Sequence, residues 1–112
     1  MRGAPLTLDE IISTPVAPNY AKPTDLQRSW CVPKLTCKDG TTISVQASEK
    51  HYCNPRDNDG PWDAVECGYP SVAPGPEMMK YAETPTNPTG TVYAWVPVEV
   101  VRAFLAEHGG AA

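Results

Sequence analysis

The sequence predicts an α+β domain in which a small antiparallel sheet of three or four strands packs against a C-terminal helix. Segments 41–48, 64–69 and 91–96 alternate apolar and polar residues with the period of two that half-buried strands show. The closing segment 97–108 changes to the period of an amphipathic helix. With 112 residues, the chain has room for one modest core, so we expect a single domain.

The N-terminal part is predicted to be a short helix followed by a Pro-rich connector. Thr7 and Glu10 have the spacing of a capping box, in which each side chain bonds the backbone N–H of the other, so we expect a helix over 7–13. The helix is ended by a group of prolines: Pro15, Pro18 and Pro23. Three apolar side chains of the connector are expected to hold it against the domain: Tyr20, Leu26 and Trp30. We therefore assign residues 1–29 to an extension and residues 30–112 to the α+β domain.

The first two strands are predicted to form a hairpin. Residues 32–36 lead into Asp39-Gly40, a pair typical of tight hairpin turns, and 41–48 return. The returning strand divides its side chains between two faces. One face holds Ile43, Val45 and Ala47, and the other holds Thr42, Ser44, Gln46 and Ser48.

Two further strands follow, and each has an expected assignment of faces. The strand at 64–69 turns three side chains to the core: Val65, Cys67 and Tyr69. The strand at 91–96 places Tyr93 and Trp95 together on one face, opposite three smaller residues: Val92, Ala94 and Val96. An aromatic face of this kind would stay wet in a monomer, so we expect homo-oligomerisation through Tyr93 and Trp95.

The closing helix has start and stop signals. Pro97 suits the first helical turn, where its missing N–H is not needed, and Gly109 and Gly110 predict the end. The buried stripe consists of Val98, Val101, Phe104 and Leu105. We expect His108 to lie on the surface at the fraying end, and a short helical turn over 77–82.

Composition excludes several classes of protein. The formal net charge of −4 argues against a binder of duplex nucleic acid, which needs clustered Lys and Arg. No apolar run approaches the roughly 18 residues of a membrane span. The N-terminus fits neither a signal peptide nor a transit peptide, so the cytosol is the expected location.

The four cysteines do not have the spacing of a metal site. They stand at positions 31, 37, 53 and 67, without a C-x2-C pair. A disulfide between Cys31 and Cys37 has a workable loop length but is unfavoured in a reducing cytosol. We expect free, mostly buried thiols and neither a metal nor a cofactor.

Catalytic patterns are weak. Cys53 with His51 suggests a nucleophile and a base, but residues two apart on an extended segment do not bond each other, and no third group is identifiable. The G-x-G-x-x-G and P-loop motifs are both absent. The sequence therefore favours a binding protein over an enzyme.

The candidate binding residues lie between the second and third strands. Arg56 follows Pro55, which favours one orientation of a guanidinium that can pair with phosphate or carboxylate. His51 and Tyr52 add a donor and a stacking face, and Gln46 and Ser48 add neutral polar groups. The alternative is a loop that stabilises itself, with Arg56 paired to one of three acids: Asp57, Asp59 or Glu66.

Trp62 is the aromatic residue assigned to this candidate site. It follows Gly60-Pro61 in a polar loop, where a large ring is expected to be poorly protected. We therefore predict that Trp62 stacks on a ligand or contacts a partner.

Four segments carry a resemblance to a family. SVQASEKHYCNPR, VECGYPS, YAETPTNPTGTVYAWVPVEVV and the closing HGG, in this order and spacing, resemble a family of small uncharacterised phage and prophage proteins. The resemblance covers about residues 38–110, whereas the Pro-rich N-terminal third, with Cys31, departs from it.

The resemblance implies a non-enzymatic counter-defence protein in the host cytoplasm. In one hypothesis the protein sequesters a small anionic, nucleotide-like immune signal with Arg56, His51, Tyr52 and Trp62. In a second, it is an anti-CRISPR type of inhibitor that binds a host defence effector through an acidic or aromatic surface. In a third, it is a virion or assembly accessory protein.

Overall fold

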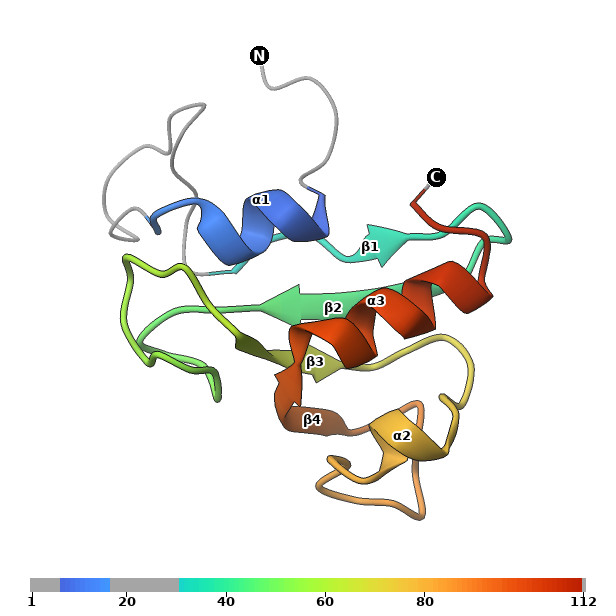
Figure 1. Cartoon of the computed structure of the whole chain (residues 1–112). Helices are drawn as coiled ribbons and strands as arrows, with labels where there is room; N and C mark the ends of the chain where they lie inside the picture. Colours follow the sequence, from blue (N-terminus) through green and yellow to red (C-terminus); the bar gives the residue numbers. More distant parts are fainter. Residues whose placement is uncertain (1–6, 17–30, 112) are drawn as a thin grey trace.

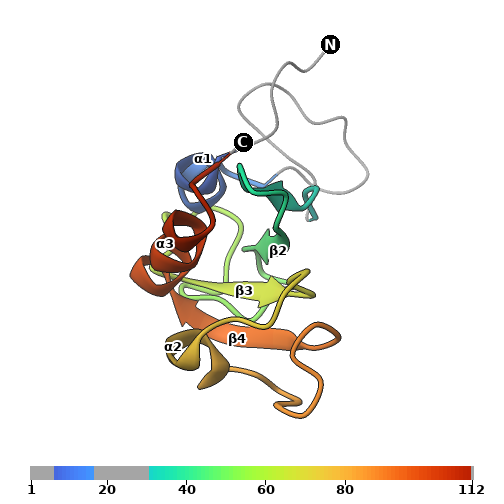
Figure 2. The same ribbon diagram turned by 90° about the vertical axis from the view of Figure 1, so that its right-hand side faces the viewer.

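The computed structural model describes residues 7–16 and 31–111. It contains an antiparallel sheet with the strands in chain order: β1 (Leu35–Thr36), β2 (Thr42–Gln46), β3 (Ala64–Gly68) and β4 (Val92–Pro97). The helices are α1 (Leu8–Ser13), α2 (Pro76–Met79) and α3 (Val98–Glu107). They gather on one side of the sheet, with α3 lying across it (Figures 1 and 2). The predicted α+β class, with a C-terminal helix on a four-stranded sheet, is confirmed.

The core lies between the sheet and these helices. The alternation predicted for β2 is correct, since Ile43, Val45 and Ala47 are all fully buried. They belong to one cluster with residues of the other strands and of α3: Val65, Cys67, Tyr93, Val96, Val101 and Phe104. Among the described residues, none of the helices has the length and apolar composition that a membrane span requires.

Helix α1 packs into this same core. Its capping box forms as predicted, with Thr7 N–H donating to Glu10 Oε1 at 2.9 Å and Glu10 N–H to Thr7 Oγ1 at 3.2 Å. Leu8 and Ile11 are buried with the strands. Helix α1, which we assigned to the extension of residues 1–29, thus packs on the core of the domain assigned to residues 30–112. The expectations for Tyr20, Leu26 and Trp30 fall outside the described residues.

A β-bulge in β4 overturns the prediction for Tyr93 and Trp95. Val96 pairs with Val65 and Tyr93 with Cys67, so Ala94 and Trp95 together lie opposite a single residue of β3. Trp95 has φ +50°, and its side chain is half exposed, whereas Tyr93 is fully buried. The extra residue interrupts the alternation, so the two rings do not share a face.

Tyr69 is also not where the alternation placed it. It directly follows β3, has φ +50° and is 48% exposed. Its N–H donates to the Thr91 carbonyl, which keeps the backbone paired while the ring points outward. The prediction of a buried Tyr69 is wrong because the left-handed backbone reverses the side-chain direction expected for a strand.

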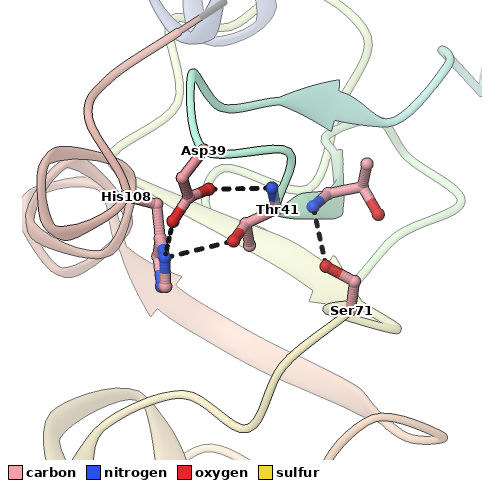
Figure 3. A network of polar contacts seen from close by, with 5 residues as sticks. Asp39, Thr41, Ser71 and His108 are labelled. Atoms are coloured by element: carbon pink, nitrogen blue, oxygen red, sulfur yellow. Dashed lines mark hydrogen bonds and ion pairs between the residues drawn. The ribbon is translucent and has the colours of Figure 1, made fainter.

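The end of α3 is tied to the β1–β2 turn. Gly109 and Gly110 have φ +90° and +80°, as the stop signal predicted. His108 Nδ1 lies 2.7 Å from Asp39 Oδ2 and 3.1 Å from Thr41 Oγ1, while Asp39 Oδ1 accepts from Thr41 N–H (Figure 3). Next to this group, Ser71 Oγ accepts from the N–H of Thr42. His108 is thus a bonded part of the fold, not the loose surface side chain we expected.

Candidate functional site

Gln46 holds the chain before β1 in place. Its Oε1 accepts from Val32 N–H and its Nε2 donates to the Val32 carbonyl, both at 2.8 Å. Nε2 also donates to Ser44 Oγ at 3.0 Å. The amide thus acts like a strand partner for Val32, and both of its hydrogens are engaged. This leaves little of the predicted ligand-binding capacity of Gln46.

Ser48 and His51 form a second buried pair. Ser48 Oγ lies 2.7 Å from His51 Nδ1 and accepts from Lys50 N–H at 3.0 Å. The other ring nitrogen, Nε2, lies 3.7 Å from Cys31 Sγ. Ser48 is therefore a positioning group for the imidazole, and its buried hydroxyl does not face outward as a ligand contact.

The prediction of an exposed Trp62 is wrong, since its side chain is only 3% exposed and belongs to the core. The backbone N–H of Trp62 donates to the Ile12 carbonyl, which brings α1 against this loop. A Cβ on Gly60 would lie 2.7 Å from the Trp62 ring, so the glycine provides the room the ring needs. The ring belongs to the same buried cluster as Leu8 and Ile11 of α1, about fifty residues away in sequence, which the polar character of the loop did not reveal.

Tyr52, Arg56 and Trp95 form a cluster at the surface, called here the aromatic stack. The rings of Tyr52 and Trp95 lie 5.1 Å apart at 34°, and Arg56 Cζ lies 5.2 Å from the centre of the Tyr52 ring. The backbone N–H of Trp95 donates to the Tyr52 carbonyl at 3.1 Å, so the bulge fixes the position of the loop that carries Tyr52. Two of the six predicted site residues thus come together, with Trp95 in the place assigned to Trp62.

Arg56 is held at one end and available at the other. Its Nε donates to the Glu49 carbonyl at 3.2 Å. Among the described residues, no hydrogen bond or ion pair is found for its two terminal nitrogens, so the alternative pairing with Asp57, Asp59 or Glu66 is not formed. The two terminal nitrogens of the guanidinium can therefore donate hydrogen bonds to a carboxylate or phosphate of a binding partner.

A small cavity lies over the side chains of β2 and β3 that point away from the helices. Its volume is about 170 Å³, and its lining includes Ser44, Gln46, His51, Glu66 and Cys31. Burial raises the pKa of Glu66, Glu83 adds to this effect, and the nearby Arg56 opposes it. The cavity therefore carries an acidic group on one wall.

The three buried cysteines, Cys37, Cys53 and Cys67, offer little chemistry. None of the four is in a disulfide, and burial raises the pKa of Cys37, Cys53 and Cys67. In the part of the chain that the structure describes, no three His, Cys, Asp or Glu side chains gather as a metal site. His108 cannot relay a proton as in a catalytic triad, because Asp39 and Thr41 both contact the same nitrogen.

Sequence reasoning missed two residues of this region, Trp95 and Cys31. The alternating strand TVYAWV contains no sign of a bulge, so nothing local indicated that Trp95 turns outward. Cys31 lies twenty residues before His51, and only the fold brings them together. Comparison with protein-family models found no match, and searches of curated proteins and of solved structures found none either.

Proposed function

We propose that this chain is a non-enzymatic binding protein that docks on another protein through the aromatic stack of Tyr52, Arg56 and Trp95. The observation that carries the proposal is the outward turn of Trp95. A bulky residue at positive φ is rare and costs of the order of 1–3 kcal/mol, and such strain tends to persist where it serves function. Here the strained backbone holds a half-exposed tryptophan ring against the ring of Tyr52, which Arg56 also contacts.

The composition of the stack supports a protein partner. Trp, Tyr and Arg are the residues most enriched among those that dominate binding energy at protein interfaces. The available guanidinium of Arg56 can form a bidentate pair with a carboxylate of the partner. The stack is at the surface, where a flat partner surface can cover it.

The dimensions of the cavity favour this function over sequestration of a nucleotide. Pockets for drug-sized ligands enclose about 300–1,000 Å³ and bury most of the ligand, whereas the cavity here has about 170 Å³. Gln46 and Ser48 are engaged within the fold, and Trp62 is in the core. The geometry thus supports the inhibitor hypothesis better than the hypothesis of a captured immune signal.

The resemblance to phage proteins supplies the biological setting of the proposal. A protein of this kind would act in the host cytoplasm, as an inhibitor of the anti-CRISPR type that binds a host defence effector. Its action would be stoichiometric, because a docking surface occupies its target and performs no chemistry.

Two variants provide a matched test. Trp95 and Tyr69 are both aromatic, both have φ +50°, and they are 50% and 48% exposed. Asn tolerates this backbone conformation, so Trp95→Asn and Tyr69→Asn remove similar rings without new strain. The tagged proteins are used for quantitative affinity capture from lysates of phage-infected host cells.

We expect a host protein that is retained by wild type and by Tyr69→Asn, and lost by at least 30-fold with Trp95→Asn. This corresponds to the roughly 2 kcal/mol of a dominant interface residue. Equal recovery with both variants contradicts the proposal. If a second copy of the chain covers the stack instead, light scattering will show an oligomer that Trp95→Asn dissociates.

A small anionic ligand is the second candidate, and the two available nitrogens of Arg56 beside the rings favour it. A nucleotide could stack its base on Trp95 and place a phosphate at Arg56. Protein purified from infected cells would then release 260 nm absorbance on heating. Arg56→Ala should weaken nucleotide binding by about 2–5 kcal/mol, and the absence of any released chromophore argues against this candidate.

A further inference from the structure

Cys31, His51 and Ser48 have the order of a nucleophile, a base and an orienting group. Cys31 Sγ lies 3.7 Å from His51 Nε2, and Ser48 Oγ lies 2.7 Å from His51 Nδ1. This is the arrangement by which thiols are activated, in which a third group fixes the imidazole. Cys53, the sequence neighbour of His51, is excluded from this role because its thiol contacts the carbonyls of Ser48 and Pro55.

The bonds around Ser48 determine how the imidazole can act. For Nε2 to accept the thiol proton of Cys31, the proton of the neutral ring must lie on Nδ1 and donate to Ser48 Oγ. Ser48 Oγ can accept this bond together with the one from Lys50 N–H. After proton transfer, both ring nitrogens donate, one to the thiolate and one to Ser48. The same positions of Cys31, His51 and Ser48 therefore suit both the neutral thiol–imidazole pair and the thiolate–imidazolium pair.

The environment distinguishes Cys31 from the other three cysteines. Cys31 is exposed and borders the cavity, whereas Cys37, Cys53 and Cys67 are buried, including Cys67, which also lines the cavity. The cavity of about 170 Å³ is below the range of about 300–1,000 Å³ for drug-sized ligands, so it fits only a small molecule. Glu66 on its wall repels anions, so an uncharged molecule is favoured over an anionic one.

We propose that Cys31 is a nucleophilic thiol with His51 as its base and Ser48 as a positioning residue, and that it captures a small uncharged carbon electrophile in this cavity. The sulfur forms a bond to the electrophilic carbon, and the thiol proton passes to His51 Nε2. In a substitution, the leaving group departs with the electron pair of its bond to carbon. In an addition to a conjugated carbonyl, the pair moves to the adjacent carbon, which takes the proton back from His51. The capture is stoichiometric and needs no co-reactant.

The test measures alkylation of the full-length protein by iodoacetamide between pH 5 and pH 9, site by site, by peptide mass spectrometry. N-acetylcysteine amide serves as the unperturbed thiol. We expect Cys31 to react at least tenfold faster than this thiol at pH 6, with a pH profile displaced to lower pH. The three buried cysteines should stay unmodified over the same period.

Variants assign the roles. His51→Gln should slow the reaction of Cys31 at pH 6 by at least tenfold, and Ser48→Ala should move its pH profile toward that of the unperturbed thiol. His108→Gln is the matched control, since it removes the other of the two histidines and should leave the reaction rate of Cys31 unchanged. Glu66→Gln should raise the rate with iodoacetate relative to iodoacetamide, because it removes the negative charge at the cavity.

The proposal is overturned if Cys31 in the folded wild-type protein has the rate and pH profile of the unperturbed thiol. It is also overturned if a folded His51→Gln variant, checked by near-UV circular dichroism, reacts as fast as wild type. If His51→Gln does not fold, the proposal is tested by the rate and pH profile of Cys31 in the wild-type protein.

Discussion

Replacing Trp95 by Gly and by Ala tests whether the bulge in β4 imposes the outward turn on this residue. Both substitutions remove the same ring and its contact with Tyr52, so their difference reports the backbone alone. At φ +50°, Ala retains the left-handed penalty of about 1–2 kcal/mol that Gly avoids. Gly loses about 0.5–1 kcal/mol more on ordering its backbone. We therefore expect Trp95→Gly to be more stable than Trp95→Ala by about 0.5–1 kcal/mol.

The measurement is urea unfolding followed by the fluorescence of the two remaining tryptophans. With a slope of about 2 kcal/mol/M, the expected difference moves the midpoint by about 0.3–0.5 M. Ala94→Gly, one residue earlier in the same strand, is the control and should instead cost about 0.5–1 kcal/mol. If Ala at position 95 is more stable than Gly by about 0.5–1 kcal/mol, as expected at position 94, with an unchanged slope, the backbone there is unstrained and the argument from Trp95 fails.

Three further substitutions test the parts of the fold that position the site. Gln46→Leu leaves the buried N–H and C=O of Val32 without their partner, so it should cost about 2–4 kcal/mol in urea unfolding. Gly60→Ala places a Cβ at 2.7 Å from the Trp62 ring and at φ +64°, so it should cost more than about 2 kcal/mol and lower the thermal midpoint. Asp39→Asn tests acid stability: hydrogen bonds lower the pKa of Asp39 to about 2, so wild type has stability above about pH 4 that it loses toward pH 2. The variant should lack this loss, and unfolding curves of the two proteins should converge near pH 2.

Local periodicity predicted the sheet and the helices because these elements follow from short-range patterns. The alternation in β2 correctly buried Ile43, Val45 and Ala47, since a strand turns successive side chains to opposite faces. The capping box at Thr7 and Glu10 was predictable for the same reason, as its two bonds join residues three apart.

The exposure of the aromatic residues could not be predicted in this way. Trp95 turns outward because two residues of β4 oppose one of β3, which depends on the pairing of distant segments. Trp62 is buried in one cluster with residues of α1, and the bond from its backbone N–H to the Ile12 carbonyl has no local signature. Gly60 was the one available signal, since a glycine beside a large ring can provide space for it.

The candidate site was predicted in part. Arg56 and Tyr52 do lie together at the surface, whereas the polar residues Gln46 and Ser48 turned inward to bond the backbone and His51. A polar side chain on a strand face can bind a ligand or satisfy its own fold, and sequence does not distinguish the two. The position of the neighbouring segment, here Val32, decides between them.

Arg56→Ala tests most directly the claim that the aromatic stack is a binding surface and not a structural brace. The substitution removes one bond at an exposed carbonyl and one contact with the Tyr52 ring. Such exposed interactions contribute about 0.5–1 kcal/mol each. We predict that the free energy of unfolding in urea falls by no more than about 2 kcal/mol, with an unchanged slope. A loss of more than about 3 kcal/mol would show that Arg56 holds the fold together, and would contradict the account.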